Sequence, residues 1–554
     1  MAAPADNGGD RALRRRGRAV NWPRVALLVH NWLGLKLFLI LSVVFLSGTT
    51  AVFRFEIDGL IYPQVRITPG ESLVSLDTIV SAVRAAYPDM GLAEDVPTGA
   101  GGGHTAVGIV GISPERGVRM IWVDPYRGVV QGDTPMVTPG FFLAKLHKDL
   151  FIPEWGTAIV CATAIVTAIV LVTGLLAYRR FWRGFLRRPR FTNLHVSMVD
   201  LHKFVGLWSL WFVIVITATG LWYFWQLVGV PKLGFPSAVQ EYRLPDLPTE
   251  RLEALGPDNP QPLSLSRALA QARERYPDFE AAYVSLPGRH GEPLIFHGNR
   301  GEVLAPYATA IAVDPFSGEV TGANLASHAS LSNRIAAMVN PLHYGDFGGL
   351  LSKSVWFVFG LGLSSLAITG VAIFWCRAAR ASAGPYSSLL RALHPWRGAM
   401  GWAKPLNWAA LAVAVVGATM TVQFYGRGTA ASPVQYPAQE VGAWRLSATL
   451  LAGFGDTHDP LRPGASALAV VGYCRECWDD IRRLWVHAGP SPPSDPEQGN
   501  LVQGRPGFAY ARLALPADLG PRQRLWLVAE GWDRRIHTSN WPITGTVSNT
   551  EHAP

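Results

Sequence analysis

The chain has 554 residues, of which 49% are hydrophobic and only 16% are charged, and its formal net charge is +9. That length exceeds one ordinary domain, and the charged fraction lies well below the roughly 25% of a typical soluble domain. The basic residues stand in blocks beside apolar runs, at 11–18 and 179–190, as the cytoplasmic loops of membrane proteins do. We therefore expect contact with a lipid bilayer and no nucleic-acid partner.

Five apolar runs meet or approach the about 20 residues that a membrane-spanning helix needs. We predict spans at 25–53, 155–178, 204–228, 354–376 and 406–425, the last interrupted by Gly417. The first run is too long for a simple signal peptide. Basic residues gather in 1–24, 179–203 and 377–405, which the positive-inside rule places in the cytoplasm. The remaining segments, 54–154, 229–353 and 426–554, then lie on the outer side.

The first two outer segments resemble each other. Each opens with a helical pattern that ends in Tyr-Pro-Asp, at 76–90 and 264–279, and continues into alternating, strand-like stretches. Each closes on a Val-Asp-Pro turn, "VDPYRGVVQG" (123–132) and "VDPFSGEVTG" (313–322), in which proline fixes φ and glycine supplies a positive φ. The chain therefore shows a duplicated unit of span, outer domain and span.

Histidines mark the same place in the first span of each unit. "VHNWLG" holds His30 and "LHKFVG" holds His202, each followed four residues later by a glycine. Gly48 and Gly220 follow these histidines by 18 residues (48 − 30 and 220 − 202). Because both histidines lie at the cytoplasmic mouths of their spans, we expect them to form a pair.

A second matched pair precedes the second span of each unit. His147 in "KLHKDLF" and His343 in "PLHYGDF" each lie 27 residues before a glycine of the span (174 − 147 and 370 − 343). These two histidines lie at the outer mouths. Imidazole is a neutral ligand of haem iron, and two imidazoles from facing helices fill both axial positions. One pair near each face predicts two haems, with the Thr-Gly pairs at 173–174, 219–220 and 369–370 allowing a macrocycle or a neighbouring helix to approach closely.

Other interpretations of the histidines remain open. Each one alone could be an ordinary interfacial residue, although ionisable groups near membrane depth are often functional. Two histidines fall short of the four ligands of structural zinc, and no Cys-x-x-Cys-His indicates covalent haem attachment. His195 shares a helical face with His202 and is an alternative partner for His30 or for a haem propionate. His328 is an alternative for the outer site, whereas His104, His290 and His394 have no repeat partner and are expected at the surface.

Acidic residues follow both outer histidines closely, Asp149 after His147 and Asp346 after His343. A carboxylate can orient a ligand imidazole. The simpler interpretation is that both are solvated acids.

The tail from 426 to 554 contains short apolar or alternating runs separated by Gly, Pro and Asp, which predicts a small β-rich domain. Within it, "GYCRECWDD" places Cys474 and Cys477 in a Cys-x-x-Cys. In an oxidising compartment the two would form a local disulfide or a redox pair. Inert thiols are the alternative, and a zinc site would need a second Cys-x-x-Cys.

Together, "VHNWLG…SGTT", "LHKDLF…VTG", "LHKFVGLW…TATG" and "LHYGDF…ITG", with the two Val-Asp-Pro turns, resemble the PepSY-associated transmembrane helix proteins. The resemblance covers about residues 20–380 and ends before the fifth span and the tail. It implies a bacterial inner-membrane protein with PepSY-like periplasmic domains and b-type haem held between four helices. His30, His147, His202 and His343 carry over by their positions in these motifs.

The family includes ferric-siderophore reductases, so the resemblance implies a transmembrane oxidoreductase that passes electrons from a cytoplasmic or quinol donor to a periplasmic ferric siderophore. The sequence shows no acid–base or nucleophilic constellation and no Gly-x-Gly-x-x-Gly unit after a strand, so an internal flavin or nicotinamide domain is not expected. Two alternatives remain: a membrane-anchored PepSY binding or regulatory protein without redox activity, and electron transfer to the Cys474–Cys477 pair or to copper.

Overall fold

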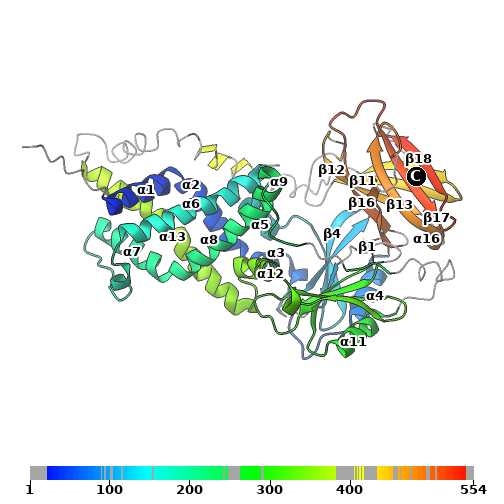
Figure 1. The fold of residues 1–554 in the computed structure, drawn as a ribbon, viewed down its shortest axis with the longest axis horizontal. Coiled ribbons are helices and arrows are strands. Elements are labelled where there is room, and N and C mark those ends of the chain that lie inside the picture. Colours follow the sequence, from blue (N-terminus) through cyan, green and yellow to red (C-terminus); the bar gives the residue numbers. More distant parts are fainter. Residues whose placement is uncertain are drawn as a thin grey trace, which may run out of the picture.

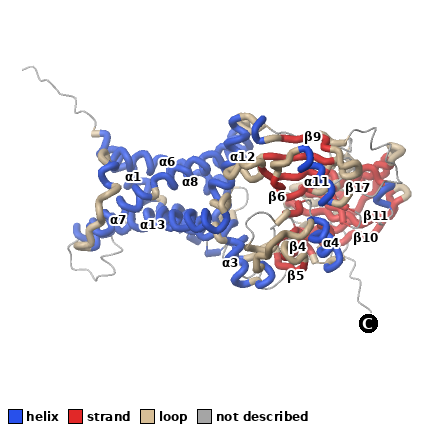
Figure 2. Tube along the Cα trace, turned by 90° about the horizontal axis from the view of Figure 1, so that it is seen from below, coloured by secondary structure: helices blue, strands red, loops and turns tan. Residues whose placement is uncertain are grey.

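The computed structural model describes residues 21–381 and 433–543, apart from short internal gaps of which 248–262 is the longest, and isolated positions between 405 and 419. A helical bundle occupies one end of the molecule and three β-containing domains occupy the other (Figure 1; Figure 2). The predicted fifth span, 406–425, lies outside the described residues except at those isolated positions.

The bundle contains helices that are long and apolar enough to cross a membrane. Within the described residues these are Gly156–Ala177 (α6), Leu210–Leu233 and the Gly349–Arg377 part of α13 (Gly349–Ala381), or four spans if α1 and α2 count as one. These bounds fall close to the runs at 155–178, 204–228 and 354–376. The bundle and its apolar composition establish a membrane protein.

The first predicted span is not one straight helix. It divides into α1 (Trp22–Lys36) and α2 (Phe38–Ala51), which meet at Leu37 with a bend of 71°. No proline stands there, and the two halves follow different neighbours, because α1 packs along α6 whereas α2 packs along α13 and α5 (Pro139–Asp149). The predicted span 25–53 therefore contains a bend that the sequence did not indicate, because tertiary packing and not local sequence sets it.

The helix of the third predicted span is also interrupted, at the position of the repeat that corresponds to the α1–α2 bend. Helix α7 (Leu194–Trp208) ends at Ser209 and α8 (Leu210–Phe224) follows it. Leu37 and Ser209 each lie seven residues after the histidine of their unit (37 − 30 and 209 − 202). Past α8, a π-helical turn at Trp225–Gly229 leads into α9 (Val230–Leu233), where Pro231 withholds a backbone donor and accounts for the local change of hydrogen bonding.

Each duplicated outer segment forms an α+β domain. The first packs α4 (Leu76–Ala86) on a sheet of order β1-β3-β4-β5, and the second packs α11 (Leu265–Arg275) on a sheet of order β2-β6-β7-β8-β9. The strands of the first are β1 (Gly91–Leu92), β3 (Val107–Ser113), β4 (Gly117–Asp124) and β5 (Val129–Pro135). Those of the second are β2 (Asp95–Pro97), β6 (Glu280–Ser285), β7 (Leu294–Asn299), β8 (Thr309–Val313) and β9 (Val320–Asn324).

The two α+β domains interlock. Strand β2 belongs to the first domain in sequence but pairs with β6 of the second, with Val96 opposite Val284. The two domains also share one apolar core, in which Ile79 of α4 and Ala268 of α11 are both fully buried. Asp77 accepts hydrogen bonds from the backbone N–H groups of Leu265 (2.8 Å) and Ser266 (2.9 Å). The duplicated segments therefore form one body.

The Val-Asp-Pro turns have the same geometry in both domains. Asp124 accepts from the backbone N–H of Tyr126 at 2.9 Å, and Asp314 accepts from that of Phe316 at 2.7 Å. Each turn ends on a glycine with a positive φ, +66° at Gly128 and +79° at Gly318, a conformation that side chains with a Cβ rarely adopt.

The tail forms a β-sandwich of a five-stranded sheet, β10-β11-β12-β16-β15, and a four-stranded sheet, β14-β13-β17-β18. The strands are β10 (Val434–Val441), β11 (Trp444–Ala452), β12 (Ser466–Tyr473), β13 (Ile481–Gly489), β14 (Asn500–Leu501), β15 (Gln503–Arg505), β16 (Phe508–Ala514), β17 (Arg524–Gly531) and β18 (Ile536–Pro542). Leu468 and Tyr510 on its outer face pack against Ile112 of β3, so the sandwich covers the first α+β domain. The predicted β-rich C-terminal domain is confirmed.

Candidate functional site

The matched histidines come together in two pairs. At the end of the bundle away from the β-domains, His30 on α1 and His202 on α7 have ring centroids 6.2 Å apart and nearly perpendicular planes. We call these two residues the distal pair. His30 Nδ1 lies 2.9 Å from the Val170 carbonyl on α6, and His202 Nδ1 lies 2.9 Å from Thr369 Oγ1 on α13. Four helices therefore converge on the distal pair.

His147 and His343 form the proximal pair, beside the β-domains. They lie on short helices that precede the spans, α5 and α12 (Leu331–Tyr344), and their ring centroids are 6.0 Å apart. His147 Nδ1 lies 2.9 Å from the Val44 carbonyl on α2, and His343 Nδ1 lies 2.8 Å from Thr219 Oγ1 on α8. The proximal pair thus has the same construction, with each ring anchored on a different helix of the bundle.

These contacts assign the same tautomer to all four rings. A backbone carbonyl only accepts hydrogen bonds, so His30 and His147 must each carry a proton on Nδ1. Thr369 donates its own proton to the Ser365 carbonyl at 2.7 Å, and Thr219 donates to the Val215 carbonyl at 2.9 Å. Both hydroxyls are therefore left to accept from an imidazole. In each ring Nε2 is then the nitrogen with a free lone pair, which is the arrangement found in metal-binding histidines.

Glycines let the rings approach the helices. A Cβ atom built at Gly48 would lie 2.6 Å from His147 Cε1, and one at Gly174 would lie 3.1 Å from His30 Cε1. At Gly370 the nearest atom is His202 Cε1, at 3.7 Å, whereas Gly220 faces Ala164 of α6. The glycines of the repeat thus accommodate imidazoles in three places and a neighbouring helix in the fourth.

There is open space beside the distal pair. One helical turn after His30, a Cβ built at Gly34 would meet no atom within 4 Å, and one turn after His202, a Cβ at Gly206 would come no closer than 3.6 Å to Leu366. Two imidazoles that bind one metal from opposite sides, at metal–nitrogen distances of about 2.0 Å, have centroids roughly 6 Å apart. The described residues contain no group of three or more His, Cys, Asp or Glu side chains placed to hold a metal ion.

Comparison with known proteins agrees with the motifs. A family described as "PepSY-associated TM region" matches residues 27–377, more than half of the chain. The chain belongs to this family. All four paired histidines fall inside the matched region, whereas a second family, described as "Uncharacterised conserved protein UCP029505", matches residues 420–544. The β-sandwich is therefore an addition to the PepSY-associated region.

One relative in the comparison bears the name of an uncharacterised protein. The protein PA4219 of Pseudomonas aeruginosa is 26% identical to this chain over 257 residues, which is 43% of this chain and 64% of the relative. The chain therefore covers less than two thirds of that relative's length.

In this PepSY-associated protein, hydrogen bonds at the start of helix α5 and the backbone conformation at its end hold His147 in position. The buried Asp58 on α3 (Arg54–Ile61) accepts from the Thr138 hydroxyl at 2.6 Å and from the Gly140 N–H at 2.7 Å, at the start of α5. At its other end Leu150 and Phe151 have positive φ angles of 52° and 57°. Two consecutive non-glycine residues in this region indicate backbone strain beside His147.

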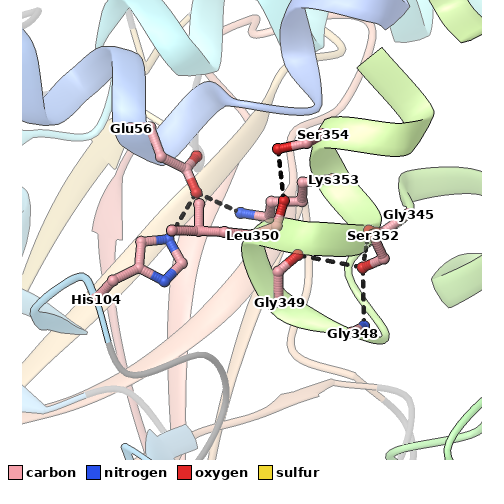
Figure 3. Close-up of polar contacts among 9 residues, drawn as sticks. All are labelled: Glu56, His104, Gly345, Gly348, Gly349, Leu350, Ser352, Lys353 and Ser354. Atoms are coloured by element: carbon pink, nitrogen blue, oxygen red, sulfur yellow. Dashed lines mark hydrogen bonds and ion pairs between the residues drawn. The ribbon is translucent and has the colours of Figure 1, made fainter. Parts of the chain in front are cut away.

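The turn between α12 and α13 fixes His343 in the same way. Trp356 Nε1 donates to the Leu342 carbonyl at 2.8 Å, directly beside His343. Ser352 Oγ donates to the Gly345 carbonyl at 2.7 Å and accepts from the Gly348 N–H at 2.9 Å (Figure 3). Gly345 has a φ of +71°, and a Cβ there would collide with the Trp356 ring. No sequence motif had identified Trp356 or Ser352.

An ion-pair cluster lies on the same side of the bundle. Glu56 Oε1 of α3 accepts from Lys353 Nζ of α13 at 2.8 Å and contacts His104 Nε2 at 2.7 Å (Figure 3). Burial alone would raise the pKa of Glu56, but the hydrogen bonds from Lys353 and His104 outweigh it and hold the pKa below its ordinary value. His104, expected at the surface, is 23% exposed and ties the first α+β domain to the bundle.

The remaining candidates lie elsewhere. His195 lies two turns before His202 on α7, and it is His202 that faces His30. His328 is exposed, in the 3₁₀ turn Ala326–His328. Asp149 binds Lys145 at 3.0 Å and the Phe151 N–H at 2.9 Å, so it stabilises the end of α5.

Cys477 is disulfide-bonded, and its predicted partner Cys474 lies outside the described residues.

Proposed function

We propose that this protein carries electrons across the membrane through two b haems and reduces an acceptor on the side of the β-domains. The two histidine pairs carry this proposal, because each offers two imidazoles with Nε2 free for a metal and Nδ1 anchored. His30 and His202 would hold one haem and His147 and His343 the other. Bound haem supplies one-electron redox chemistry.

The donor set fits haem better than a bare metal ion. A structural zinc site takes four ligands from the protein, and each pair supplies two. Haem supplies the remaining ligands of its iron and needs only the two axial ones. The open space at Gly34, one helical turn after His30, supports a flat group beside the distal rings.

The separation of the pairs suits a transmembrane path. His202 and Thr219, the partner of His343, lie 17 residues apart on the α7–α8 run (219 − 202), which corresponds to about 25 Å along a continuous helix. The protein then anchors the axial imidazoles, excludes water from the bundle and sets the distance between the two haems.

Orientation follows from charge. The basic segment 179–203 lies at the distal end of the bundle between α6 and α7, and basic loops remain in the cytoplasm. The distal pair would then hold its haem on the side of a cytoplasmic or quinol electron donor, and the β-domains would lie in the periplasm of a bacterial inner membrane.

A cavity near the proximal pair supports a bound acceptor. It has a volume of about 550 Å³ and lies between the second α+β domain and α12, the helix of His343. Its polar lining includes Glu302, Tyr307, Asn333 and Arg334. A volume in the range of about 300–1,000 Å³ suits a small-molecule ligand. We propose a ferric siderophore as this acceptor, because siderophores hold iron(III) far more tightly than iron(II), so one electron per iron releases the metal.

A second acceptor deserves a test because Cys477 is disulfide-bonded. Two electrons and two protons would convert a Cys474–Cys477 disulfide into two thiols. Replacing both residues with serine separates the two acceptors, since ferric reduction is expected to continue unchanged in the double variant if iron is the acceptor.

The deciding experiment is a visible spectrum of the full-length protein in detergent, oxidised and dithionite-reduced, with a pyridine haemochrome count. Two b haems per chain are expected. His30→Ala and His343→Ala should each remove one haem, whereas the exposed His328→Ala should remove none. A colourless protein from haem-supplied cells would overturn the proposal and favour a membrane-anchored binding or regulatory protein.

A further inference from the structure

A small, strongly basic pocket is lined by residues of α7 and of the segment before it. Helix α7 lies at the distal end of the bundle, away from the three β-containing domains (Figure 1). The pocket forms where the segment after α6 folds back on α7. Four cationic side chains line it and only one acidic side chain does, together with Tyr178 and Phe204; the charged residues are Arg187, Arg188, Arg190, Lys203 and Asp200.

The single acid is already engaged. Asp200 binds the Arg190 guanidinium through two contacts, at 2.7 and 3.2 Å, and the Arg190 backbone N–H at 3.1 Å. No ion pair engages Arg187 or Arg188 among the residues that the structure describes. Lys203 Nζ lies 5.3 Å from the centre of the Tyr178 ring, a cation–π contact. The pocket therefore keeps an excess of positive charge for a ligand.

The pocket is built into the fold. Gly184 is buried, and a Cβ there would lie 2.8 Å from the Tyr178 hydroxyl. Trp208 of α7 donates its indole N–H to the Phe185 carbonyl at 3.1 Å. This hydrogen bond and the ion pair between Arg190 and Asp200 attach the basic segment to α7 at two points.

Apolar side chains surround the basic ones. Leu186 is 94% exposed and Phe191 is 74% exposed, and Trp182 and Leu194 are exposed beside them. Large exposed apolar groups among arginines are typical of segments that lie at the membrane surface. Tryptophan also favours the membrane–water interface.

We propose that this pocket binds the phosphate of an anionic phospholipid. Arginine and lysine side chains suit a phosphate, and basic pockets between membrane helices bind anionic headgroups. The volume of about 50 Å³ accommodates a headgroup phosphate but is far below the 300 Å³ or more of a site that encloses a small molecule. The acyl chains would lie against the exposed apolar side chains.

The test uses full-length protein in detergent and native mass spectrometry with phosphatidylglycerol, phosphatidylcholine or inorganic phosphate. Phosphatidylglycerol is expected to bind and to raise Tm, and phosphatidylcholine is not. Surface cations each contribute about fivefold to the affinity for anionic lipid, so R187Q/R188Q should weaken phosphatidylglycerol binding roughly 25-fold. The matched variant R179Q/R180Q removes the same charge from the same segment outside the pocket and should retain binding.

Three results would overturn the proposal. Equal losses in the two double variants would indicate diffuse surface attraction. If inorganic phosphate raises Tm as much as phosphatidylglycerol does, the pocket is a site for a free anion. If R187Q/R188Q loses haem while its lipid binding is unchanged, the arginines bind a haem propionate. If R187Q/R188Q does not fold, K203M at an exposed position provides the same comparison. Lipid binding does not require haem. A negative haem spectrum would therefore leave the lipid proposal standing, and a negative lipid measurement would leave the haem proposal standing.

Discussion

Thr219 Oγ1 lies 2.8 Å from His343 Nδ1 and donates its own proton to the Val215 carbonyl. The hydroxyl therefore faces the imidazole as an acceptor, and the imidazole presents Nε2 with its lone pair free. Thr369 has the same relationship to His202 at the other end of the bundle. One threonine per pair thus sets the tautomer of a candidate haem ligand.

Thr219→Val should weaken the proximal haem site alone. Valine keeps the shape of threonine but offers no acceptor to His343, and loss of such an outer-shell partner typically lowers metal affinity by about 10- to 100-fold. Haem titration and the midpoint potentials of the two haems would measure the effect. Thr167→Val is the matched control, because the Thr167 hydroxyl bonds the Thr163 carbonyl of its own helix at 2.7 Å and contacts no histidine of the two pairs. Equal losses in both variants would contradict the role assigned to Thr219.

Gly48→Ala should displace His147. The added methyl would lie 2.6 Å from His147 Cε1, on the edge of the ring whose Nδ1 lies 2.9 Å from the Val44 carbonyl of the same helix. We expect loss of the proximal haem with the distal haem retained, read from the haemochrome count. Gly370→Ala is the control, since its methyl would meet His202 Cε1 at an ordinary 3.7 Å. A full haem complement in Gly48→Ala would show that the ring can move without losing its ligand.

The repeat made the histidine pairs predictable from sequence. Four histidines in matched registers fix both the depth and the partner of each ring, and the two Val-Asp-Pro turns fix the ends of two homologous sheets. The partners of Nδ1 were not predictable in the same way. Val44 and Val170 act through backbone carbonyls, which any residue type offers, so no side-chain signal marks them.

Features set by tertiary packing were also missed. No proline near Leu37 indicates the bend between α1 and α2. Strand β2 pairs with the sheet of the other α+β domain, because the two similar domains share one core. Asp58 and Trp356 act on helix ends that are far from them in sequence. Local patterns cannot reveal such contacts, because only the folded chain brings these segments together.

Asp77→Ala should loosen the contact between the two α+β domains. Its carboxylate accepts from the first two backbone N–H groups of α11, a helix with no acidic residue in its own first turn. Loss of a helix cap costs about 0.5–2 kcal/mol. Hydrogen exchange at the start of α11 and the Tm of the full chain would measure the change. Glu71→Gln, an exposed acid on the same domain, should leave both unchanged.

The same contact predicts a pH dependence. Burial would raise the pKa of Asp77, but the hydrogen bonds from Ser266 and Leu265 outweigh it and lower the pKa below its ordinary value. The stabilisation is therefore complete above the ordinary carboxyl pKa of about 3.9 and is lost as the pH falls through the lower, folded-state value. Wild type and Asp77→Ala should converge in stability at acid pH, and a constant difference down to pH 2 would contradict this.

Glu56→Gln should destabilise the junction between the bundle and the first α+β domain. Lys353 is 12% exposed, so the variant leaves a largely buried cation without its acidic partner, which costs about 1–3 kcal/mol. Because the pKa of Glu56 is lowered, this contribution is present above the ordinary glutamate pKa and is lost as the pH falls through the folded-state value. Combining Glu56→Gln with Lys353→Met should cost less than the sum of the single changes. Glu319→Gln, an exposed acid, is the control, and additive losses in the double variant would show that Glu56 and Lys353 act independently.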